Sequence, residues 1–191
     1  CLNIGLALML VMSLLPQGPF RAQGLSVAAM CEPATEVGGD YYDFLPLPDG
    51  RVGVLIADVS GKGTSAALYM AELKGLMLSL SRLHSSPRAL LIEADRIISQ
   101  HLGSRSFITM TYAVIDLDRR RVTMARAGHT PMILVSAAGS DVVTPGGMVL
   151  GFRLPGDEGL FERVLEERVH PLEPGDVIVL YTDGVTEAMD V

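Results

Sequence analysis

The order of hydrophobic patterns along the chain constrains its fold more than any other feature. Extended, alternating runs come first, two helical patterns follow between residues 64 and 102, and further extended runs fill the second half. Because strands and helices are segregated instead of alternating, the pattern predicts an α+β fold built on antiparallel sheet. A length of 191 residues is typical of one domain with a substantial core.

The expected elements are bounded by glycine, proline and polar turns. The sequence Pro48-Asp-Gly50 predicts a hairpin between two early strands. A capping Thr64 or Ser65 starts a helix that runs to about His84 and is apolar nearly all round, and Ser86-Pro87 starts a second helix that ends near residue 102. Residues 145–160 are predicted to form a loop. The predicted strands are 25–32, 40–47, 51–58, 107–117, 121–127, 131–137, 163–172 and 176–182.

Composition excludes several classes of protein. Hydrophobic residues make up 49% of the chain and charged residues 19%, which excludes a disordered chain. A formal charge of −7 argues against nucleic-acid binding, and Arg119-Arg-Arg121 fits a solvated turn. Cys1 and Cys31 make neither a disulfide framework nor a zinc site, so we expect a reducing, cytoplasmic location.

The N-terminal segment differs from the rest of the chain. Residues 1–15 are uncharged and almost wholly apolar, and Pro16 ends the run. We expect a linker or pairing helix that is buried against a partner or against the domain. The alternative is the end of a transmembrane helix, with the domain as the cytoplasmic part of a membrane-attached sensor. The predicted organisation is an apolar helix and linker over residues 1–24 and one domain over 25–191, incomplete at the C-terminus.

Three acidic residues stand out as candidate ligands. Asp58 and Asp183 follow apolar strand-like runs, and Asp40 follows Gly38-Gly39, which allow close backbone approach. Oxygen ligands that converge from several strand ends suit Mg²⁺ or Mn²⁺, and this favours metal-assisted hydrolysis of a phosphate ester. The structural alternatives are a carboxylate at a helix N-terminus for Asp58 and a turn-and-cap role for Asp183.

Other polar residues are assigned structural roles or left open. Ser60-Gly-Lys-Gly-Thr-Ser65 does not match a P-loop, because Gly63 follows the lysine and no glycine stands at the upstream position. Asp43 lies three residues after Asp40 and would face the opposite side of a strand. His129, in Ala127-Gly-His-Thr-Pro131, fits a hairpin histidine bonded to backbone, with a catalytic base as the alternative.

Several motifs in register resemble those of a known family. The sequence resembles the PPM-type (PP2C-like) metal-dependent serine/threonine phosphatases, in the bacterial SpoIIE/RsbU branch. The motifs are Val37-Gly-Gly-Asp-Tyr-Tyr-Asp-Phe44, Asp58-Val-Ser-Gly-Lys-Gly-Thr-Ser-Ala-Ala67, Ala127-Gly-His129 and Tyr181-Thr-Asp-Gly-Val-Thr-Glu-Ala188, and Ser13-Leu-Leu-Pro16 matches the helix that leads into the domain.

The resemblance implies a β-sandwich flanked by helices in four αββα layers, with two Mn²⁺ or Mg²⁺ ions at one end. It implies that Asp58 bridges the ions, that the Val59 carbonyl and Asp183 each bind one, and that Asp40 acts directly or through water. A metal-activated water would hydrolyse phosphoserine or phosphothreonine on a partner, typically a STAS-type anti-sigma-factor antagonist. An upstream sensory domain and a homodimer through the N-terminal helix or the 64–102 helices are also implied.

Two departures from the family pattern bear on activity. The family's last metal-binding aspartate has no match in this sequence, and Ser60 stands where eukaryotic relatives carry a histidine that protonates the leaving group. On the motifs that are present, the predicted function is a metal-dependent protein phosphatase. The alternatives are a phosphatase-like module that docks a STAS-type regulator without catalysis, and a hydrolase of small phosphoesters.

Overall fold

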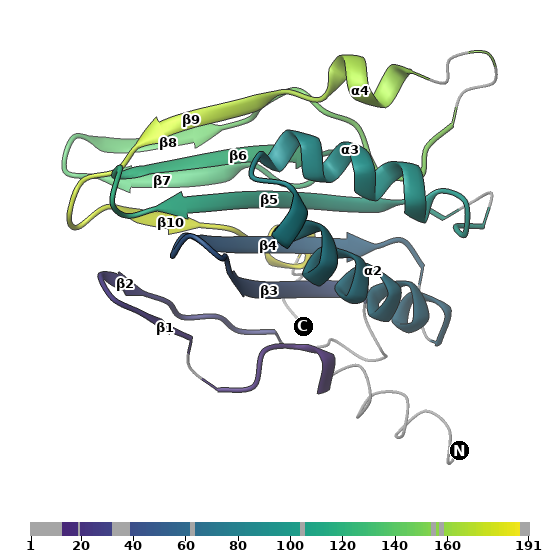
Figure 1. Cartoon of the computed structure of the whole chain (residues 1–191), viewed down its shortest axis with the longest axis horizontal. Helices are drawn as coiled ribbons and strands as arrows, with labels where there is room; N and C mark the ends of the chain where they lie inside the picture. The colour runs from purple at the N-terminus through teal and green to yellow at the C-terminus, as the bar shows by residue number, and fades with distance from the viewer. Residues whose placement is uncertain are drawn as a thin grey trace.

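The fold has three layers in the part of the chain that the structure describes. This computed structural model describes residues 13–18, 20–31, 39–61, 64–103, 106–153, 156 and 159–187. Two helices lie on one face of a five-stranded sheet, and a smaller sheet lies against its other face (Figure 1). The predicted α+β sandwich with antiparallel sheets is confirmed.

The larger sheet is antiparallel throughout. Its strand order is β3 (Asp40–Pro46), β4 (Val52–Val59), β5 (Ile108–Asp116), β6 (Arg121–Ala127) and β9 (Glu167–Pro171). The predicted hairpin joins β3 and β4. The strands β4, β5 and β6 have hydrogen-bonded neighbours on both sides, so the middle of this sheet is the most constrained part of the fold.

The smaller sheet completes the sandwich. Its order is β10 (Val177–Val179), β7 (Met132–Ser136) and β8 (Gly139–Val143), again antiparallel. A separate short hairpin pairs β1 (Arg21–Ala22) with β2 (Leu25–Ser26). The core between the two sheets consists of Ala113, Ile115, Val122 and Met124 from the larger sheet and Met132, Leu134 and Val143 from the smaller one.

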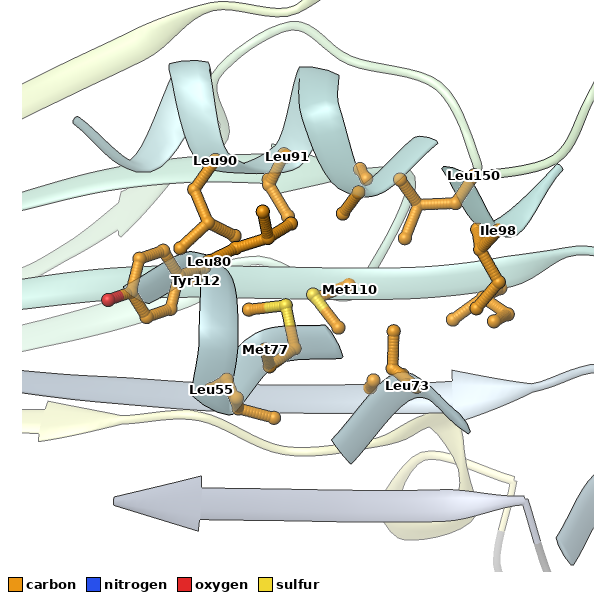
Figure 2. Packing of buried hydrophobic residues seen from close by; sticks show 14 of the residues in the cluster. Leu55, Leu73, Met77, Leu80, Leu90, Leu91, Ile98, Met110, Tyr112 and Leu150 are labelled. Carbon is orange, nitrogen blue, oxygen red and sulfur yellow. The ribbon is translucent and has the colours of Figure 1, made fainter. Parts of the chain in front are cut away.

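Helices α2 (Thr64–Leu83) and α3 (Pro87–Ile98) cover the other face of the larger sheet. Ser86 caps α3 by accepting the Ala89 N–H at 3.1 Å, and Pro87 stands in its first turn, as expected. Figure 2 shows how leucine and methionine side chains of both helices pack onto strand residues. The residues of this hydrophobic core that are labelled in Figure 2 are Leu55, Leu73, Met77, Leu80, Leu90, Leu91, Ile98, Met110, Tyr112 and Leu150.

The structure corrects several predicted elements. The first part of the expected strand 163–172 is the end of helix α4 (Leu160–Val164), because Phe161 and Leu165 bury one helical side at a spacing of four residues. The strand β8 was not predicted because its sequence is polar and it is mostly exposed at a sheet edge. The expected strand 25–32 is reduced to β2, and its end at Glu32 lies outside the described residues.

Two further expectations concern the helices. Leu68 and Leu83 of α2 are 71% and 76% exposed, so the described residues cover this helix on one side only. Leu15 at the end of the apolar N-terminal run is buried in the main core, while residues 1–12 lie outside the described part. Within the described ranges, no helix is long and apolar enough to cross a bilayer, and no helix covers the outer face of the smaller sheet.

Candidate metal centre

Asp40 and Asp58 lie directly opposite each other across the first two strands of the larger sheet. The register pairs Asp40 with Asp58 and Asp58 with Thr109 of β5. Because cross-strand partners point to the same face, these three side chains form a row. Leu55, Ala57 and Val59 alternate with Asp58 and belong to the helix-side core, so the row lies on the face that carries the second sheet.

Gly39 has no side chain, and this leaves room for the oxygen atoms of the site. A Cβ at this position would stand 2.1 Å from the Val59 carbonyl oxygen and 2.8 Å from Asp58 Oδ1. The Val59 N–H also donates to the Gly39 carbonyl at 3.1 Å, which holds the two backbones together. The Val59 carbonyl and the Asp58 carboxylate are the groups that the resemblance assigns to metal binding. The oxygen-rich surroundings of Gly39 therefore fit a hard cation.

Asp183 reaches the same region from a distant part of the sequence. It begins the 3₁₀ turn η1 (Asp183–Val185), after β10, and its side chain is exposed. The neighbouring Thr182 side chain hydrogen-bonds to the Asp40 carboxylate, and this contact favours the ionised form of Asp40. The three acidic residues predicted from sequence are thus brought to one end of the sandwich.

The electrostatics of the site reflect crowded negative charge. Burial, then the charges of Asp40 and Asp183, raise the pKa of Asp58 to about 6. The pKa of Asp40 is also raised, chiefly by burial and further by Asp183, against the opposing Thr182 bond. A divalent cation among these carboxylates would relieve their repulsion and favour their ionised forms.

The carboxylates do not form a closed ligand cage. Within the described residues, no three His, Cys, Asp or Glu side chains converge closely enough to hold one ion. Asp40, Asp58 and the Val59 carbonyl make a close set, and Asp183 stands beside it and acts on it through its charge. The arrangement fits an ion bound to the strand residues, with Asp183 of the exposed turn as a further ligand.

His129 lies beside this site and is 5% exposed. Its Nδ1 is 2.8 Å from the Thr109 hydroxyl oxygen, so the ring bonds to a side chain of β5. Burial, and to a smaller extent Arg126, lower the His129 pKa to about 4, while Asp183 and the Tyr181 carbonyl oppose the shift. The ring is therefore neutral at pH 7. Sequence reasoning missed Thr109 and Thr182, since threonines in strands and turns are too common to signal a site.

Asp43 and Ser60 have structural partners. Asp43 faces α2, where its Oδ2 accepts from Lys74 and from Tyr41, which agrees with its predicted place on the opposite face from Asp40. Ser60 Oγ accepts the Phe107 N–H at 2.8 Å and so joins the ends of β4 and β5. Gly38 and Lys62 lie outside the described residues.

Comparison with known proteins agrees with the motifs. The Stage II sporulation protein E (SpoIIE) family model matches residues 48–191, which include Asp58 and Asp183. The chain belongs to the SpoIIE family. It is 36% identical over 169 residues to phosphoserine phosphatase RsbU of Bacillus subtilis, covering 87% of this chain and 48% of RsbU. It thus spans about half the length of this SpoIIE-family relative.

Two solved structures have the same fold. The RsbU and RsbW domains of a Mycobacterium tuberculosis protein align with a TM-score of 0.66 and 33% identity, covering 82% of this chain and 42% of that one. The PP2C phosphatase domain of SpoIIE from Bacillus subtilis, with a fragment of its regulatory domain, aligns with a TM-score of 0.66 and 20% identity, covering 79% and 42%. The second similarity shows the fold alone.

Proposed function

We propose that this SpoIIE-family chain is the catalytic part of a Mn²⁺- or Mg²⁺-dependent protein phosphatase that hydrolyses phosphoserine or phosphothreonine on a partner protein. The observation that carries the proposal is the cross-strand pair Asp40–Asp58, with Asp183 adding charge from a separate segment. Carboxylates crowded at the end of a rigid sandwich favour a hard cation over an empty site.

Each residue has a defined part in this proposal. Asp58, the Val59 carbonyl, Asp183 and Asp40 would hold two divalent cations. When bound, two such ions neutralise phosphate charge and lower the pKa of water to supply a nucleophile near neutral pH. Asp58 is held by hydrogen-bonded strands on both sides, so it keeps its position without reorganisation.

Protonation of the leaving oxygen falls to water in this proposal. Ser60 stands two residues after Asp58, and its oxygen is engaged with the Phe107 N–H. A serine hydroxyl is a poor acid, and the buried neutral ring of His129 is turned toward Thr109. No residue described near Asp58 is therefore suited to act as the general acid.

The proposed substrate is a phosphorylated STAS-type anti-sigma-factor antagonist, by analogy with the family branch to which the motifs point. We further propose control by an upstream sensory domain and a homodimer, through the N-terminal helix or the helices α2 and α3. The exposed side of α2 supports such a contact, since Leu68, Leu78 and Leu83 are 71%, 43% and 76% exposed.

The test is Mn²⁺-dependent phosphate release from a phosphorylated STAS-type protein by the full-length protein. Asp58→Asn should lower this rate by more than about 100-fold, because the bridging charge is lost. Asp141→Asn, which removes an exposed carboxylate of β8, is the matched control and should leave the rate unchanged.

Other outcomes would assign other functions. Tight partner binding without metal-stimulated turnover would make the chain a docking module. Comparable rates on the phosphoprotein and on free small phosphoesters would make it a hydrolase of small phosphoesters. Equal rates for wild type and Asp58→Asn would refute the metal assignment.

A further inference from the structure

One of the segments that connect the two sheets lies between the two halves of the candidate site. Asp58 belongs to β4 in the larger sheet, whereas Asp183 follows β10 of the smaller sheet. Residues 128–131 pass from β6 to β7, that is, from one sheet to the other. His129 is in this loop, and its Nδ1 lies 2.8 Å from the hydroxyl of Thr109, the cross-strand neighbour of Asp58.

The same loop also contacts the segment that carries Asp183. The Thr130 hydroxyl donates to the Tyr181 carbonyl. The His129 carbonyl accepts from Arg126 Nη1 at 2.6 Å, which fixes the backbone at this point. Gly128 has φ +66°, and a Cβ there would meet Val149 at 2.7 Å, so the loop conformation is tightly defined.

The neighbouring residues His129 and Thr130 each bond to a different half of the site. His129 Nδ1 lies 2.8 Å from the Thr109 hydroxyl of β5, and the Thr130 hydroxyl donates to the Tyr181 carbonyl. Burial keeps the ring neutral, against the opposing effects of Asp183 and the Tyr181 carbonyl on its pKa. Nε2 is buried and has no hydrogen-bond partner in the described part of the chain, so the bond to Thr109 is the contact that holds the ring.

We propose that His129 is a positioning residue: its bond to Thr109 holds the 128–131 loop on β5, the loop holds Tyr181 through Thr130, and Asp183 is thereby set relative to Asp58. The inference rests on the proposed function, because it assigns His129 to the support of the metal ligands. His129 is not assigned a catalytic role, since its side chain is 5% exposed and enclosed by protein. Partners of this kind orient ligands and tune affinity without contacting substrate.

The test is Mn²⁺ titration calorimetry on the full-length protein, with Mn²⁺-dependent turnover measured alongside. His129→Ala should raise the Mn²⁺ Kd about 10–100-fold, with the rate at saturating Mn²⁺ largely retained. His129→Asn keeps a polar atom near Nδ1, beside Thr109, and should recover most of the affinity, whereas His129→Gln places its amide near Nε2 and should not. Thr109→Val should weaken Mn²⁺ binding, and Thr109→Ser should not.

The outcomes separate this inference from the proposed function. A wild-type protein that binds no Mn²⁺ would refute the proposed function before any variant is compared. Wild-type affinity in His129→Ala, or an unchanged Kd with a lost rate, would overturn the positioning role alone. If thermal melts show that the His129 variants are unfolded, equal Mn²⁺ affinities of Thr109→Val and Thr109→Ser would overturn it.

Discussion

Lys74 of α2 and Asp43 of β3 form an ion pair on the helix-side face of the larger sheet, with Lys74 Nζ 2.7 Å from Asp43 Oδ2. The same Asp43 oxygen accepts the Tyr41 hydroxyl at 2.7 Å, and the Lys74 ammonium lies 5.7 Å from the Tyr41 ring centroid. The two side chains of the pair are only 24% and 9% exposed. This contact attaches α2 to the strand that begins with Asp40, from the face opposite to the site.

Removing both partners of this pair should cost less than the sum of the two single removals. Lys74→Met leaves a buried Asp43 carboxylate without its cation, and we expect a loss of about 2–3 kcal/mol in the free energy of unfolding. The double variant Asp43→Asn/Lys74→Met should recover about 1 kcal/mol or more of the summed losses in urea denaturation. Additive losses would show that the pair contributes no coupling.

Gly39→Ala should abolish Mn²⁺ binding. Its Cβ would stand 2.1 Å from the Val59 carbonyl oxygen, so β3 and β4 would have to separate at the ligands. Calorimetry should detect no binding, together with a loss of thermal stability. Gly75→Ala is the control, because a Cβ there meets nothing within 4 Å in the exposed part of α2. It should leave Mn²⁺ binding intact and add up to about 1 kcal/mol of stability.

Asp58→Asn should have opposite effects with and without metal. In metal-free protein it removes a partly buried charge and the repulsion of that charge with Asp40 and Asp183. After allowance for solvent screening we expect a gain of about 1 kcal/mol in the free energy of unfolding, which raises the Tm by about 2–4 °C. The increase in Tm that Mn²⁺ gives the wild type should disappear. A metal-free Tm below that of wild type would contradict the crowded-charge account, with Asp141→Asn expected to change neither value.

Asp58 should contribute a loss of stability to the metal-free protein as the pH rises from about 4 to about 6, whereas His129, whose pKa is lowered to about 4, contributes a gain over the same range. The pKa of Asp58 is about 6 in the folded chain and 3.8 in its ordinary environment. Between these values the folded chain holds more protons than the unfolded chain, so raising the pH favours unfolding. Thermal melts across this range should show a Tm that changes more positively with pH in Asp58→Asn than in wild type, because only the Asp58 contribution is removed. An equal slope in both proteins would assign the effect to other groups.

Local sequence was enough to predict much of the fold. The capped start of α3 at Ser86-Pro87 and the Pro48-Asp-Gly50 hairpin depend on contacts between near neighbours, and both are confirmed. The first part of the predicted strand 163–172 is wrong: residues 163–164 are the end of α4, where burial of Phe161 and Leu165 favours a helical turn, and the strand begins only at Glu167. Tertiary packing of this kind cannot be deduced from a short apolar pattern.

The site was predicted less completely than the fold. Asp40 and Asp58 were identified from glycine-rich turns beside apolar runs, but their direct pairing depends on strand register. The roles of Thr109 and Thr182 arise only when distant segments meet. Their hydrogen bonds to His129 and Asp40 leave no local pattern in the sequence.

The separation of the ligands along the chain has a consequence during synthesis on the ribosome. Asp40 and Asp58 meet within one hairpin, whereas Asp183 emerges only after β5 to β10 have been translated. A nascent chain therefore carries the repelling pair alone while most of the sandwich is still being made. Under the proposed function, a nascent chain holds this set of acidic ligands only after Asp183 has been made, so the site cannot assemble before the second sheet has left the ribosome.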